Sequence, residues 1–106
     1  MFSSKFLKSK LQLEISNIFS EKLKAEWETL EDNSNITPFQ TFFWQKTWFD
    51  TIGSKRNIQP YIIKVYSNQM CIAIFPFCIK KKYLKLIYWN GGIQTDYNLP
   101  LINNKY

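Results

Sequence analysis

The spacing of apolar residues changes at Gly53, from a helical period to an alternation. From Leu23 to Ile52, apolar side chains recur every three to four residues, as on one face of an α helix. From Ile58 to Tyr66 the period is two, which is typical of a strand. In a chain of 106 residues this change predicts helices first and an antiparallel β-meander after them. We therefore expect one α+β domain over 1–106.

Two helices are predicted before this change. Ser20 is a favoured N-cap and Glu21 suits a first turn, which predicts a helix over 21–31. Its apolar residues share one face: Leu23, Trp27 and Leu30. Thr37-Pro38-Phe39-Gln40 has the pattern of a capping box with proline at the first helical position. It predicts a second helix over 38–52, ended by a left-handed Gly53.

The second helix carries apolar residues on two sides. One stripe is Phe39, Phe42, Phe43 and Phe49, and the other is Trp44, Trp48 and Ile52. A helix of this kind is usually packed on both sides. The alternative interpretation is that one stripe lines a ligand cleft.

The remaining elements are predicted strands. Leu11, Leu13 and Ile15 alternate with polar residues and indicate a short strand before the first helix. The meander should consist of strands 58–66, 70–79 and 83–89, with Asn68 at positive φ in the first hairpin loop. The second strand is apolar on both faces, which favours a central position. Pro76 within it should mark a bulge or a position without a partner, because proline cannot donate a ladder hydrogen bond.

The cysteines and the amino-terminal residues indicate a cytoplasmic protein. Cys71 and Cys78 lie seven residues apart in one predicted strand, so we expect them on opposite faces and about 23 Å apart. Free thiols suit a reducing compartment. The first twenty residues lack the apolar core of a signal peptide, because charged and polar residues interrupt every run. No stretch reaches the length of a membrane span.

Composition excludes several kinds of site. The chain has no histidine, which removes Ser-His-Asp and Cys-His nucleophile systems, and we expect no metal site. No glycine-rich phosphate loop is present. The net charge is +6, but the basic residues are mostly scattered lysines, apart from Lys80 to Lys82 and the amino-terminal lysines. We therefore do not expect a nucleic-acid partner, although a single-strand binder with stacking aromatics stays an alternative.

The features from Trp27 to about Leu101 follow a recognisable order. A helix with Trp and Leu is followed by Pro-Phe and two tryptophans, a hairpin that ends in an apolar run around proline, a basic turn, a strand, a glycine and an Asp-Tyr pair. The corresponding residues are Trp27 and Leu30, Pro38 and Phe39, Trp44 and Trp48, Ile72 to Phe77, Lys80 to Lys82, Leu84 to Leu86, Gly91 or Gly92, and Asp96 and Tyr97. This order resembles the first half of GNAT-like acyltransferases of the cellulose-biosynthesis (CelD-like) type, relatives of the Fem aminoacyl transferases.

The resemblance implies acyl transfer from acyl-CoA, or a similar donor, to an amine acceptor. In the family, a Gln/Arg-x-x-Gly-x-Gly/Ala turn that opens a helix holds the donor pyrophosphate through main-chain N–H groups. That turn lies downstream of the matched region. We therefore expect 1–106 to be an amino-terminal portion that binds no cofactor by itself and is inactive without its other half.

We expect substrate contacts at the start of the second helix and in the loop after the last strand, both common positions for ligand contacts. These residues are Phe39, Gln40, Trp44, Asp96 and Tyr97. Asp96 alone would also be consistent with a plain turn former. No catalytic residue is assigned.

An alternative function is a non-enzymatic interaction module that uses exposed aromatic residues. A half-domain would also leave an unpaired strand edge and an uncovered apolar stripe. We therefore expect either a missing carboxyl-terminal half or self-association, through Trp44, Trp48 or the strand 83–89.

Overall fold

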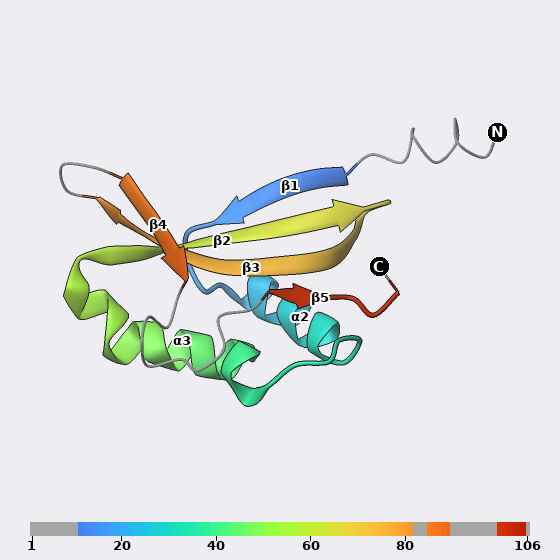
Figure 1. Ribbon diagram of the computed structural model, residues 1–106, viewed down its shortest axis with the longest axis horizontal. Coiled ribbons are helices and arrows are strands. Elements are labelled where there is room, and N and C mark those ends of the chain that lie inside the picture. Colours follow the sequence, from blue (N-terminus) through green and yellow to red (C-terminus); the bar gives the residue numbers. More distant parts are fainter. Residues whose placement is uncertain (1–10, 82–84, 90–99, 106) are drawn as a thin grey trace.

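The computed structural model describes residues 11–81, 85–89 and 100–105, and the side chains of 11–80 and 100–105. Its strands are β1 (Leu11–Ser16), β2 (Ile58–Ser67), β3 (Met70–Lys81), β4 (Lys85–Trp89) and β5 (Leu101–Ile102). They form an antiparallel sheet in the order β1-β2-β3-β4, and β5 also pairs with β3. The helices α2 (Glu21–Glu31) and α3 (Phe42–Thr51) lie on one side of this sheet (Figure 1). The predicted α+β class, with two helices before an antiparallel meander, is confirmed.

Helix α2 has the predicted bounds and the predicted cap. The Ser20 hydroxyl accepts a hydrogen bond from the Leu23 N–H at 3.1 Å. The apolar face of α2 is fully buried against Ile62 of β2 and Ile74 of β3. Local capping and tertiary packing favour the same conformation here, which explains why the sequence was sufficient.

The predicted helix over 38–52 is divided in the structure, so its continuity was predicted wrongly. Pro38–Gln40 forms a 3₁₀ helix, Thr41 is extended, and α3 starts at Phe42. The Thr41 hydroxyl donates to the Pro38 carbonyl at 2.8 Å and accepts from the Trp44 N–H at 3.2 Å. A second threonine cap thus starts a new helix four residues after the first.

Gly53 does not end the helix in the left-handed conformation, which corrects a second prediction. It opens a 3₁₀ helix over Gly53–Arg56, and the left-handed residue is Asn57, with φ 59°. Glycine is required at 53 for space, since a Cβ there would lie 2.9 Å from ring atoms of both Trp48 and Phe49.

The strands predicted at 58–66 and 70–79 are confirmed, and β3 is central. The two-residue loop between them has φ 52° at Asn68 and 68° at Gln69, as a tight hairpin of this kind requires. β4 covers the described part of the predicted strand 83–89, whereas 82–84 and 90–99 lie outside the described residues.

Pro76 lies where two strands share one edge of β3. Strand β5 pairs with residues 73–74 and β4 with residues 77–81. Among the described residues Pro76 therefore has a cross-strand partner only on β2, as expected for a residue without an N–H. The bulge of the hairpin lies elsewhere, between Val65 and Tyr66.

Neither cysteine is in a disulfide, as predicted, but they do not face opposite sides of the sheet. Cys71 packs against the core formed with α2, and Cys78 packs with Trp48 of α3. The irregular register beside Tyr66, which pairs with Cys71, shifts the alternation of side chains by one residue. Sequence spacing alone does not reveal such a shift.

The other side of the sheet is apolar and is not covered by a helix among the described residues. We call it the open face. Cross-strand register places these residues on it: Leu11, Leu13, Ile15, Tyr61, Ile63, Val65, Ala73, Phe75, Phe77 and Ile102. Its exposure is greatest on the edge strand β1, where Leu13 is 68% exposed. No described helix is both long enough and apolar enough to cross a lipid bilayer.

Candidate functional site

A groove of about 320 Å³ runs along α3, and we call it the aromatic groove. Its lining residues are Phe43, Trp44, Thr47, Trp48, Thr51 and Ile52. Phe43 is 76% exposed, whereas Trp48 is buried in a core with Ile58 and Cys78. The groove therefore has a firmly packed floor and an exposed aromatic rim.

Two of the predicted site residues meet beside this groove. The rings of Phe39 and Trp44 pack edge to face, with 5.4 Å between their centroids. Trp44 also packs against the core beneath α3. The 3₁₀ helix and α3 hold the two rings in one cluster, because Thr41 joins these elements through both of its hydroxyl bonds.

The side chain of Gln40 joins separate segments of the chain. It is 3% exposed, its Oε1 accepts from the Thr37 N–H at 2.8 Å, and its Nε2 donates to the Pro100 carbonyl at 3.1 Å. Its own carbonyl accepts from the Trp27 indole at 2.9 Å. The other two predicted site residues, Asp96 and Tyr97, lie outside the described residues.

A second groove, also of about 320 Å³, lies between the helices, and we call it the interhelical groove. Its lining residues are Glu21, Lys24, Glu28, Phe42, Phe43, Lys46 and Thr47. Phe43 and Thr47 line both grooves, so the two form one continuous surface. Lys46 also bonds to Asp50 at 2.5 Å, one turn along α3.

The position of α3 beside α2 is fixed by a carboxylate. Glu31, the last residue of α2, accepts a hydrogen bond from the Phe42 N–H at 2.8 Å. This bond satisfies a free donor at the start of α3. Partial burial raises the pKa of the Glu31 carboxyl, although the backbone bond acts in the opposite direction.

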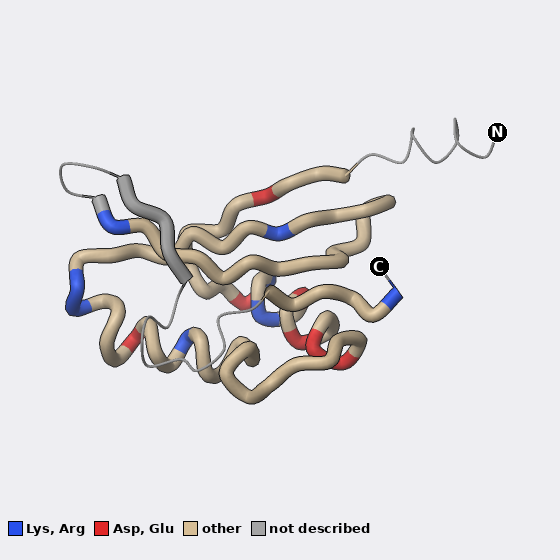
Figure 2. The backbone as a smooth tube through the Cα atoms, in the orientation of Figure 1, with Lys and Arg blue, Asp and Glu red and all other residues tan. Residues whose placement is uncertain are grey.

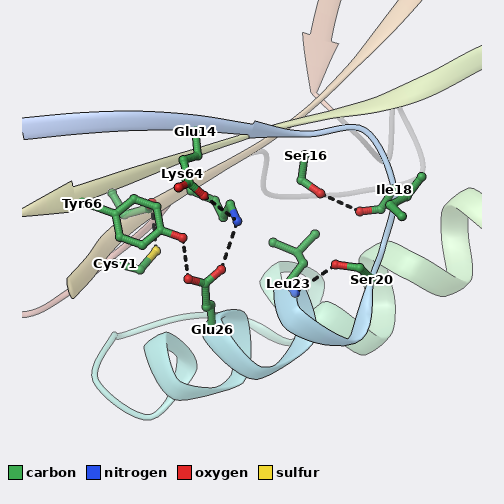
Figure 3. A network of polar contacts seen from close by, with 10 residues as sticks. Glu14, Ser16, Ile18, Ser20, Leu23, Glu26, Lys64, Tyr66 and Cys71 are labelled. Atoms are coloured by element: carbon green, nitrogen blue, oxygen red, sulfur yellow. Dashed lines mark hydrogen bonds and ion pairs between the residues drawn. The ribbon is translucent and has the colours of Figure 1, made fainter. Parts of the chain in front are cut away.

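A buried charged network lies between α2 and the sheet (Figure 3). The Lys64 ammonium, on a residue that is 5% exposed, lies 3.0 Å from Glu26 and 3.4 Å from Glu14. The Tyr66 hydroxyl donates to the other oxygen of Glu26. Together these contacts connect α2 with β1 and β2.

Tyr66 in this network and the thiol beside it both stay protonated near neutral pH. Burial, helped by the hydrogen bond to Glu26, raises the pKa of Tyr66 far above its usual value, so the phenol keeps its proton. Burial also raises the pKa of the neighbouring Cys71 thiol to about 11. What the contacts show is a polar connection between α2 and the sheet.

The network was not predicted from the sequence. The available signal was the position of Lys64. It lies two residues from both Ile62 and Tyr66 and therefore shares their apolar face of β2. A charge at such a position needs a partner.

Basic residues are distributed over α2, α3, the 53–56 helix, β2 and β3, and the view in Figure 2 shows no continuous basic band along the described chain. Within the described ranges, no group of three or more His, Cys, Asp or Glu side chains could hold a metal ion. No protein-family model, curated protein or solved structure matches this chain.

Proposed function

We propose that this chain is the acceptor-side, amino-terminal portion of a GNAT-like N-acyltransferase, and that the joined aromatic and interhelical grooves receive the amine acceptor. The observation that carries this proposal is the presence of two helices on one side of an antiparallel meander. That arrangement agrees with what the family resemblance implies for the first half of such a domain. One fold can host many functions, so the function has to be inferred from the residues that line the grooves.

The grooves have the chemistry that an amine requires. A protonated amine is attracted to the faces of aromatic rings, and Phe43 and Trp44 expose rings at the shared rim. The interhelical groove adds two carboxylates, from Glu21 and Glu28. The same groove also holds two lysines, Lys24 and Lys46, so its charges balance. Lys46 is bonded to Asp50, which lowers its effect on an incoming cation.

The acyl donor would be bound outside these residues. The only glycines are Gly53, Gly91 and Gly92, and none of them lies in a Gln/Arg-x-x-Gly-x-Gly/Ala sequence. Gly53 is also enclosed by Trp48 and Phe49. We propose that acyl-CoA, the donor implied by the resemblance, is held by a second half that the printed sequence does not include.

Amine binding can be followed in ¹H–¹⁵N spectra, in which each tryptophan indole N–H gives its own signal. Spermidine, glucosamine and a lysine ester are suitable probes, since they differ in size and charge. We expect at least one of them to shift the Trp44 indole signal in a saturable manner. Phe43→Ala should abolish that shift, whereas Ile18→Ala, which removes an apolar side chain 67% exposed outside both grooves, should preserve it. No shift at Trp44 with any amine would contradict the acceptor site.

Donor binding is a separate test. Calorimetry of the 106-residue chain with acetyl-CoA should show no saturable binding in the micromolar range. Clear binding would contradict the division between the acceptor half and the donor half.

A non-enzymatic interaction module is the second candidate function. The observation that favours it is the open face, which has exposed apolar residues and an edge strand. Such a module would bind a partner with no dependence on acyl-CoA.

A further inference from the structure

The open face is a continuous apolar surface built from alternate residues of four strands. Register places side chains in rows across it, and the two longest rows are Leu13, Val65, Ala73 and Ile102, and Ile15, Ile63 and Phe75. Phe75 and Phe77 stack on it, with 6.1 Å between their ring centroids. Soluble monomers rarely leave a surface of this kind uncovered.

Exposure on this face is largest at its edge. Leu11, Leu13 and Ile15 of β1 are 65%, 68% and 50% exposed. These residues contribute little to the core of one chain, yet they are apolar at every alternate position. This pattern is the one expected where another apolar surface covers β1.

The charge distribution favours a second copy as the partner. The chain carries a net charge of +6, which would oppose self-association through most of its surface. Over β1, β2, β5 and residues 73–77 of β3, register places no charged residue on the open face. Lys81 and Lys85 fall on this face by register, but at the far end of β3 and β4. Two copies can therefore meet over β1, β2 and residues 73–77 without a like-charge contact, and a two-fold axis would place apolar residues opposite apolar residues.

The area is consistent with a dimer of moderate strength. With strands about 4.8 Å apart and a rise of about 3.3 Å per residue, β1 to β3 present roughly 450 Å² of flat surface per copy. Two copies would together cover roughly 900 Å² of flat surface, and the side chains that project from it add to this area. The result is close to the lower end of specific interfaces, at about 1,000–1,200 Å². Because area does not set affinity, the dissociation constant has to be measured over a wide concentration range.

We propose that this chain forms a two-fold symmetric homodimer in which the open faces of two copies pack against each other, sheet on sheet, with Leu13, Val65 and Phe75 in the contact. The two sheets would lie about 10 Å apart, as in a β-sandwich. The aromatic and interhelical grooves are in the helix layer on the other side of the sheet. The dimer is thus independent of the proposed acceptor site.

Sedimentation of the 106-residue chain from submicromolar to several hundred micromolar concentration tests this proposal. We expect a reversible monomer–dimer equilibrium. Leu13→Lys at the edge and Val65→Lys at the centre should each weaken dimerisation by at least about tenfold, because they place a charge in an apolar contact. Phe43→Lys is the matched control, since it adds the same charge at a residue 76% exposed on α3, and it should leave the dimer unchanged.

Several outcomes would overturn the proposal. A wild-type chain that stays monomeric at all concentrations would do so, including one that instead floats with anionic phospholipid vesicles. A dimer that survives Val65→Lys would indicate edge-to-edge pairing of β1. Far-ultraviolet circular dichroism establishes whether each variant folds. If Val65→Lys does not fold, the result for Leu13→Lys decides whether the open face is the dimer contact.

Discussion

The two faces of the sheet are built from the same strands, but they have different roles. On the helix-covered face, Ile62, Ile74 and Cys78 are fully buried by α2 and α3. On the open face, residues one position away, such as Ile63 and Phe75, stay partly exposed. The difference shows that a strand with apolar residues on both faces can be recognised from the sequence, but what covers each face cannot. One face stabilises the fold, and the other is available for a partner.

The largest expected difference concerns Trp27, at the centre of the helix-covered core. Trp27 is fully buried, contacts Phe42, and donates its indole N–H to the Gln40 carbonyl at 2.9 Å. Trp27→Ala should lower the free energy of unfolding by about 3–5 kcal/mol, the range for a deleted buried aromatic side chain. Urea denaturation measures this change. Phe43→Ala, at an exposed ring of similar type, should change it by less than about 1 kcal/mol.

An intermediate effect is expected from the charged network under α2. Glu26→Gln removes the nearest counter-charge of Lys64 and weakens the acceptor of the Tyr66 hydroxyl bond. We expect a loss of about 3 kcal/mol, at the low end for a broken buried pair, because Glu14 stays 3.4 Å from Lys64. Glu28→Gln on the exposed side of the same helix is the control. Equal losses for both variants would show that the network does not hold α2 on the sheet.

A smaller effect should appear at alkaline pH. The folded state raises the pKa of Cys71 from 9.0 to about 11 and also raises that of Tyr66, so both groups keep their protons to higher pH than in the unfolded chain. The free energy of unfolding should therefore be constant below about pH 9 and fall as the pH rises towards 11. Cys71→Ala should make this fall shallower. A wild-type stability that is constant from pH 8 to pH 11 would contradict the buried position of both groups.

The elements best predicted from the sequence are those whose signals are local. Ser20, Glu21 and the spacing of Leu23, Trp27 and Leu30 lie within α2 itself, and all of them act in the structure as expected. The tight hairpin at Asn68 is local in the same sense. Where two local signals compete, as the Thr37 and Thr41 caps do, the sequence did not reveal that the helix restarts at Phe42.

The features that could not be predicted depend on distant residues. Gln40 belongs to a local cap, but its bond to Pro100 joins residues sixty positions apart. Cys71 faces the helices because of a bulge in the register with β2. Lys64 is buried because Glu26 and Glu14 approach it from two other elements. Of the candidate site, the sequence placed Phe39 and Trp44 on different stripes of one helix, and their ring contact was not predicted.

The central claim is that the open face is an apolar surface that dimerisation covers, and dye fluorescence tests it most directly. Anilinonaphthalene sulfonate gains fluorescence on apolar surfaces, and it can be measured on the folded chain across a dilution series. The account predicts a clear signal per chain that rises on dilution, as the dimer dissociates. At a concentration where the wild-type chain is dimeric, Val65→Lys should raise the signal per chain, because it keeps the open face uncovered. A folded chain with cooperative unfolding and no dye signal at any concentration would contradict both the open face and the half-domain interpretation.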